Sequence, residues 1–132
     1  MRVVLDTNVF VSGIHWAGSS EKILRAWIEG KFELVSSLPI IEEIVRILAN
    51  FKLPLDADDI SWWESLILEK SLVVVPSEEV DIVKNDPDDN KFIEAALEAQ
   101  AEYIISQDKH LLLIKEYRGI KIVHPDDFSE LL

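Results

Sequence analysis

Five short apolar runs alternate with helix-like segments along this chain, and that alternation limits the folds it can adopt. The runs cover residues 2–5, 32–35, 71–75, 103–106 and 120–123, and Val and Ile, which favour strands, recur in them. Strands separated by helical crossovers pair in parallel, with helices covering both faces of the sheet. The sequence therefore predicts a three-layer α/β/α sandwich around a five-stranded parallel sheet, formed as one domain over residues 1–132.

Helical periodicity and capping residues locate the segments between these strands. The expected helices are Ser20–Glu29, a helix from Ser36 or Ser37 to Asn50, one opened by Asp56 or Asp58, Asp86–Ala101, Lys109–Glu116 and a final turn over Pro125–Leu132. The segment 6–19, rich in Asn, Gly and Ser, is expected to be a loop. Trp62 and Trp63 are adjacent on one expected helix, so about 100° separates them and one should be exposed. Exposed apolar patches often mark partner surfaces, which favours a homodimer or a protein partner.

The composition bounds the class of protein. An apolar fraction of 48% in 132 residues suffices for a buried core, and the absence of cysteine excludes disulfides and thiolate metal sites. No apolar run approaches the roughly 18 residues of a membrane span, and no signal segment opens the chain, so we expect a cytoplasmic protein. A net charge of −12 argues against nonspecific nucleic-acid binding. The 13 basic residues could still line one groove, and Lys22 and Arg25 are candidates to meet phosphates.

Three acidic residues stand where this architecture could bring them together. Asp6 follows the first predicted strand directly, and Asp108 stands just past the fourth. Ligands of open parallel sheets bind at the carboxyl ends of the strands. Glu43 borders the apolar stripe of its predicted helix, because Ile40 and Ile47 flank it at i−3 and i+4. We expect these carboxylates to meet at one edge of the sheet.

Helix geometry also separates neighbouring acids into different roles. Glu42 precedes Arg46 by four residues, the favourable order for a surface ion pair, so Glu42 is expected on the solvated face. Asp89 precedes Phe92 and Ile93 at i+3 and i+4, so it starts the inward face of its helix. An unpaired carboxylate is costly there. A bound cation would remove that cost.

Each acid has an ordinary structural role as an alternative, such as forming a turn, bordering a core or capping a helix. Their shared placement favours a metal site, because converging carboxylates repel one another unless a cation such as Mg²⁺ or Mn²⁺ neutralises them. The catalytic and metal-binding candidates are therefore Asp6, Glu43, Asp89 and Asp108, with Asn8, Ser106 and Asp86 in support. Asn8 is expected to orient Asp6 through its amide, and Ser106 to hydrogen-bond a carboxylate.

These segments resemble the PIN domain family, specifically small VapC-like toxins of toxin–antitoxin pairs. The opening LDTNVFVSG is similar to the strand and D-T-N with which the family begins, and Ser37 through Glu43 to Leu48 is similar to its second motif. The stretch DPDDNKFIEAALEAQAEYIISQDKHLL is the most specific match and carries the third and fourth family acids onto Asp89 and Asp108. The resemblance covers nearly the whole chain. It implies a 3-2-1-4-5 parallel sheet, ribonuclease activity dependent on Mg²⁺ or Mn²⁺, frequent dimerisation and a cognate antitoxin.

The sequence thus predicts a metal-dependent endoribonuclease that hydrolyses RNA phosphodiester bonds. A Mg²⁺-binding receiver domain ranks lower, because Asp89 opens a helix and Glu43 lies within one, whereas a receiver needs an acceptor Asp directly after a central strand. A PIN-like scaffold kept only for protein binding is a second alternative, which the presence of all four acids disfavours. An aspartyl nucleophile of the phosphatase type is disfavoured because Asn8 stands where a second Asp would be needed.

Overall fold

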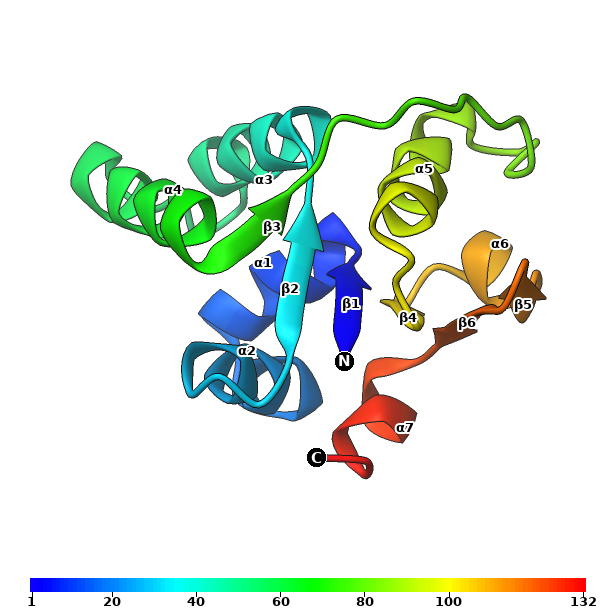
Figure 1. Cartoon of the computed structure of the whole chain (residues 1–132). Coiled ribbons are helices and arrows are strands. Elements are labelled where there is room, and N and C mark those ends of the chain that lie inside the picture. The colour runs from blue at the N-terminus through cyan, green and yellow to red at the C-terminus, as the bar shows by residue number, and fades with distance from the viewer.

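The computed structural model covers residues 1–132 and contains one six-stranded sheet (Figure 1). The strands are β1 (Arg2–Leu5), β2 (Glu33–Ser36), β3 (Ser71–Val73), β4 (Tyr103–Ile105), β5 (Glu116–Tyr117) and β6 (Ile120–Val123), in the order β3-β2-β1-β4-β6-β5. The five strands other than β5 pair in parallel. The predicted sandwich and its 3-2-1-4-5 order are confirmed, with β6 as the fifth parallel strand.

The sixth strand corrects the prediction of a five-stranded, wholly parallel sheet. β5 pairs antiparallel with β6 across a two-residue turn at Arg118 and Gly119. Both turn residues have positive φ, 48° and 85°, which is the backbone that tight hairpins require. Residues 109–116, expected as one helix, accordingly divide into the short α6 (Lys109–Leu112) and the start of this hairpin.

Helices cover both faces of the sheet. They are α1 (Thr7–His15), α2 (Ser19–Ile28), α3 (Leu38–Asn50), α4 (Ala57–Lys70), the 3₁₀ turn η1 (Pro87–Asp89), α5 (Asn90–Ala99), α6 and α7 (Pro125–Ser129). α1 packs against α2, and α2 against α7. Figure 1 shows α5 on the other side of β1 and β4 from this group. No helix has the length and apolarity that a membrane crossing requires.

The segment predicted as the loop 6–19 is mostly helix, and this changes how the first acid is held. Asp6 caps α1, which buries Val9, Phe10 and Val11 in the core. Gly13 permits the close contact with α2, because a Cβ there would stand 2.7 Å from Leu24 Cδ1. Polar residues in 6–19 masked the helical pattern, so the loop prediction was wrong.

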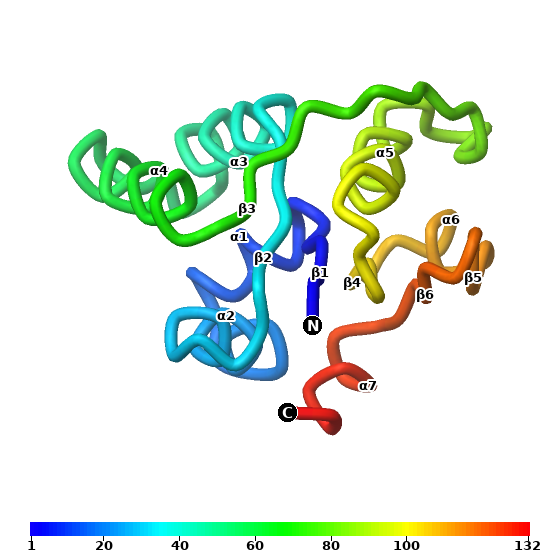
Figure 2. Tube along the Cα trace, in the orientation of Figure 1, coloured from blue at the N-terminus to red at the C-terminus, as the bar shows by residue number.

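The carboxyl ends of β1, β2 and β4 lie side by side, since Val4 pairs with Val35 and Leu5 with Ile105. The connection from β3 to η1, residues 74–86, crosses the end of the molecule toward which β1 and β2 point (Figures 1 and 2). Asn90 anchors that connection, because its Oδ1 accepts hydrogen bonds from the backbone N–H groups of Ile82 and Val83. The fold thereby brings η1 over the edge where the strands end.

Candidate active site

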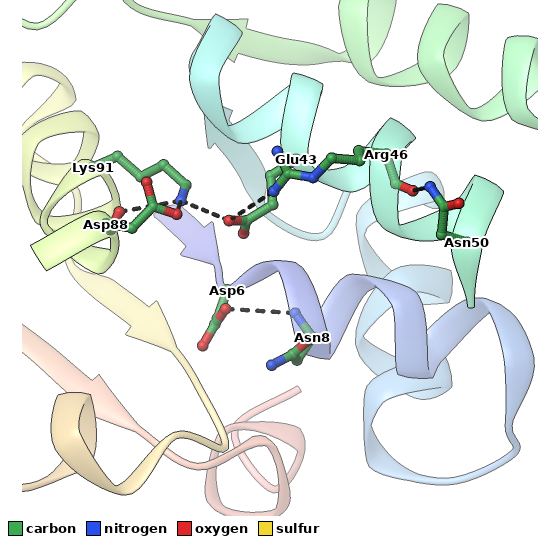
Figure 3. Close-up of polar contacts among 7 residues, drawn as sticks. All are labelled: Asp6, Asn8, Glu43, Arg46, Asn50, Asp88 and Lys91. Atoms are coloured by element: carbon green, nitrogen blue, oxygen red, sulfur yellow. Dashed lines mark hydrogen bonds and ion pairs between the residues drawn. The ribbon is translucent and has the colours of Figure 1, made fainter. Parts of the chain in front are cut away.

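Asp6 is fixed at the carboxyl end of β1 by hydrogen bonds to both carboxylate oxygens. Ser106 Oγ donates to Asp6 Oδ2 at 2.6 Å, and the backbone N–H of Asn8 lies 3.4 Å from Asp6 Oδ1. Figure 3 shows the second contact at the first turn of α1. The expected role of the Asn8 side-chain amide is wrong for this structure, because the backbone makes the contact and Asn8 is exposed. Burial raises the pKa of Asp6, and the hydrogen bonds oppose that rise.

Ser106 joins two of the candidate acids. Its hydroxyl donates to Asp6 and accepts a hydrogen bond of 2.9 Å from the backbone N–H of Asp108. Asp108 caps α6 through a 2.7 Å hydrogen bond from the backbone N–H of His110 to its Oδ1. The capping role considered for Asp108 is therefore real, and it leaves the second carboxylate oxygen without a hydrogen bond from the chain.

Three carboxylates lie close enough together to hold one metal ion. One oxygen from each of Asp86, Asp89 and Asp108 lies within 4.8 Å of the others, and we call these residues the acidic triad. Asp86 is the N-cap of η1 and Asp89 its last residue, whereas Asp108 lies in the loop after β4. Asp6 and Glu43 stand outside the triad, although the charges of Asp6 and Asp108 both act on Asp89. The fold thus brings distant parts of the sequence together.

Asp89 is the most perturbed acid of the site. It is 9% exposed and accepts no hydrogen bond through its side chain. Burial is the largest cause that raises its pKa from 3.8 to about 7, followed by repulsion from Asp6, Asp86 and Asp108, while Lys91 lowers it. Such a carboxyl is close to half-protonated at neutral pH. Strong perturbation by burial and like charges is typical of functional sites.

Glu43 is held by cations from two helices (Figure 3). Its Oε2 lies 2.8 Å from Lys91 Nζ and 3.8 Å from Arg46 Nη2. Arg46, expected to pair with Glu42, pairs instead with Glu43, while Glu42 is exposed. Helix spacing separated the two glutamates by face but could not reveal Lys91, which lies 48 residues away in sequence.

The residues present fit a hard divalent cation. Two oxygens bound to one ion at about 2.1 Å can stand up to about 4.2 Å apart, or about 5 Å for longer metal–oxygen bonds. The spacing of up to 4.8 Å within the triad therefore needs at most small side-chain rotations. All donors are carboxylate oxygens, which suit Mg²⁺ and Mn²⁺. Three buried hydroxyls at the ends of β1 and β2 also lack a protein partner, namely those of Thr7, Ser36 and Ser37.

Lys22 and Arg25 do not lie at this edge. They line a surface hollow of about 270 Å³ with Glu29 and Lys31, and Lys31 immediately precedes Phe32 and the start of β2. Arg25 is also paired with Glu21 in its own helix. The suggestion that these two cations meet phosphates at the acidic site is not supported.

Comparison with known proteins identifies the family. A profile described as "PIN domain" matches residues 2–110, which include Asp6, Glu43 and the whole acidic triad. The chain belongs to the PIN domain family. It is also 32% identical over 146 aligned positions to the uncharacterized protein MJ1680 of Methanocaldococcus jannaschii, with 98% of this chain and 90% of the relative covered.

Solved structures share this PIN fold at low sequence identity. VapBC-1 from nontypeable Haemophilus influenzae superposes with a TM-score of 0.65 and 15% identity over 96% of this chain and 99% of that one. PAE2754 from Pyrobaculum aerophilum gives 0.62 and 14% over 98% and 87%. VapBC2 from Rickettsia felis, bound to a DNA fragment from its promoter, gives 0.60 and 11% over 94% and 98%. Membership of the PIN family leaves the receiver-domain alternative without support.

Proposed function

We propose that residues 1–132 form one PIN nuclease domain that hydrolyses RNA phosphodiester bonds with the aid of Mg²⁺ or Mn²⁺. The observation that carries this proposal is the acidic triad of Asp86, Asp89 and Asp108, with Asp6 and Glu43 near enough for charge effects among these acids. These residues come from the end of β1, the middle of α3, the N-cap and the last residue of η1, and the loop after β4. Carboxylates gathered at one edge of a sheet repel one another, and this repulsion destabilises the fold unless a bound cation neutralises it.

In the proposed site, the acids would bind the cation and Ser106 would orient one of them. Asp89 and Asp108, with Asp86, would hold the cation, and Asp6 and Glu43 would complete the site directly or through water. When bound, Mg²⁺ or Mn²⁺ lowers the pKa of a water molecule toward neutrality and offsets the charge that grows on the scissile phosphate. Ser106 keeps Asp6 facing the site through the 2.6 Å hydrogen bond. Asp89 must lose its proton to act as a ligand, which ties binding to pH.

The structural comparisons and the exposed surface also support a proposal about partners. Two of the structural neighbours are VapBC proteins, which supports a cognate antitoxin and a toxin role for this chain. Trp62 is 57% exposed on α4, with Leu68, Leu53 and Trp16 also exposed on the surface. Large exposed apolar side chains favour a protein contact, either a homodimer or the antitoxin. We propose a cytoplasmic protein with RNA as its substrate.

Cleavage of a labelled single-stranded RNA by the purified protein tests the proposal. Wild type should cleave with Mg²⁺ or Mn²⁺ and stop with EDTA. Asp6→Asn and Asp89→Asn should lose at least about a hundredfold in rate, the usual scale for an electrostatic group at a reacting centre. Glu42→Gln is the matched control, because Glu42 is exposed beside Glu43, and it should keep wild-type activity while Glu43→Gln does not.

The same assay distinguishes the proposed nuclease from the remaining alternative. A PIN scaffold kept only for protein binding would cleave nothing in any metal, yet would still fold and bind its partner. If Glu42→Gln abolished cleavage and Glu43→Gln did not, the assignment of the two glutamates to opposite roles would be wrong.

A further inference from the structure

Lys91 is a half-buried cation inside the acidic site, and its ammonium is fully used. The side chain is 11% exposed. Its Nζ donates to Glu43 Oε2 at 2.8 Å, to Asp88 Oδ2 at 2.7 Å and to the backbone carbonyl of Asp88 at 3.1 Å. A lysine ammonium has three N–H donors, so these contacts satisfy all of them. Lys91 therefore has no free donor for an RNA phosphate.

The contacts of Lys91 also fix where Glu43 points. Figure 3 shows the ammonium between Glu43 on α3 and Asp88 on η1. Two of the three acceptors belong to Asp88, three residues before Lys91, so the ammonium has contacts that hold it in place independently of Glu43. Arg46 adds a weaker contact from the far side, since its Nη2 lies 3.8 Å from Glu43 Oε2 and its side chain is 66% exposed.

Glu43 and the acidic triad consequently differ in how their charge is balanced. Glu43 has a permanent cation at hydrogen-bond distance, whereas no lysine or arginine forms an ion pair with Asp86, Asp89 or Asp108. A centre with two divalent ions holds them about 3.5–4 Å apart and needs carboxylates on both sides. A second ion beside Glu43 would have to displace the Lys91 ammonium. Otherwise it would be repelled by the positive charge of that ammonium in a partly buried environment.

We propose that Lys91 is a positioning residue that keeps Glu43 out of direct metal contact and thereby limits the site to one divalent cation, held by the acidic triad. The inference rests on the proposed function, because it presumes that the acids bind a metal at all. Lys91 takes the place of a second ion: it neutralises Glu43 and joins α3 to η1 while the triad holds the exchangeable cation.

The number of Mn²⁺ ions bound per chain tests this inference without any activity assay. Mn²⁺ alone is the probe, and the free-ion electron paramagnetic resonance signal is titrated with the full chain. Wild type should bind one Mn²⁺. Lys91→Met, which keeps the length of the side chain without its charge, should release Glu43 and bind two. Lys91→Met combined with Glu43→Gln should return to one, since the second ion needs the Glu43 carboxylate.

Lys84→Met is the matched control, because Lys84 also pairs with an aspartate at i−3 and its loss changes the net charge equally. That pair, Lys84 Nζ to Asp81 Oδ2 at 2.9 Å, is exposed and involves neither Glu43 nor a residue of the triad. Lys84→Met should bind one Mn²⁺. A second ion in this variant would show that net charge alone sets the number and would overturn the role of Lys91.

Each failure has a different meaning. Wild type that binds no Mn²⁺ contradicts the proposed function itself, whereas wild type that binds two overturns only the role of Lys91. A folded Lys91→Met that still binds one ion also overturns it. If circular dichroism shows that Lys91→Met does not fold, Glu43→Gln alone decides. This variant should still bind one ion, and loss of that ion would make Glu43 a direct ligand and refute the inference.

Discussion

Asp89→Asn should stabilise the metal-free protein, and by an amount that depends on pH. The folded-state pKa of about 7 lies above the ordinary value of 3.8. Between these values the folded state binds more protons than the unfolded state, so stability falls as pH rises. At about 1.4 kcal/mol per pKa unit, the full penalty above pH 7 approaches about 4 kcal/mol. Between pH 5 and pH 8 the expected part of that loss is about 2–3 kcal/mol.

Urea unfolding in EDTA at several pH values measures this effect. The free energy of unfolding of wild type should fall relative to that of Asp89→Asn by about 2–3 kcal/mol from pH 5 to pH 8. Asp88→Asn is the control from the same segment. The hydrogen bond from Lys91 lowers the pKa of Asp88, so this carboxyl is ionised in both states across the range. The free energy of unfolding of Asp88→Asn should therefore change with pH in the same way as that of wild type.

Parallel curves for wild type and Asp89→Asn would refute the reasoning, because they would mean that folding does not change the proton affinity of Asp89. A curve for Asp89→Asn that falls below wild type at pH 8 in EDTA would do so as well. Mn²⁺ should close most of the gap between wild type and Asp89→Asn at pH 8, since a ligand of the folded state at a hundredfold excess over its Kd contributes about 2.7 kcal/mol, against a penalty of about 4 kcal/mol.

Two further predictions concern the cap of α6 and the surface of α4. Metal-free Asp108→Asn should melt no lower than wild type, because an amide oxygen can still accept the hydrogen bond from the His110 N–H. Adding Mn²⁺ should raise its melting temperature less than that of wild type. Equal rises would show that Asp108 caps α6 and does not bind the metal. Trp62→Glu should lower the mass seen by light scattering if this 57% exposed side chain lies in a homodimer contact. An unchanged monomeric mass in both proteins would remove that basis for dimerisation.

The sequence predicted the parallel core of the fold well, because its signals are local and repeated. Each Val- and Ile-rich run became a strand, and the crossovers fixed parallel pairing. The hairpin at Arg118 and Gly119 was missed because a two-residue strand carries almost no periodic signal. The helix α1 was missed because Asn8, Ser12 and Gly13 are residue types that favour loops, whereas packing against α2 is visible only in the structure.

The candidate acids could be named from the sequence, whereas the side chains that contact them could not. Strand ends and helix faces pointed to Asp6, Glu43, Asp89 and Asp108, since those signals are set by backbone period. The partners of these acids depend on tertiary contacts: Lys91 reaches Glu43 from another helix, and Ser106 reaches Asp6 across the β1–β4 pair. The closeness of Asp86 to Asp89 and Asp108 likewise required the actual path of η1.

The most direct test of a metal-dependent nuclease site is an anomalous difference map from crystals soaked in Mn²⁺. We expect one peak per chain, in contact with Asp86, Asp89 and Asp108, and no such peak in Asp89→Asn crystals soaked in the same way. A peak held elsewhere, or none at the acidic triad at an ion concentration that supports RNA cleavage, would contradict it.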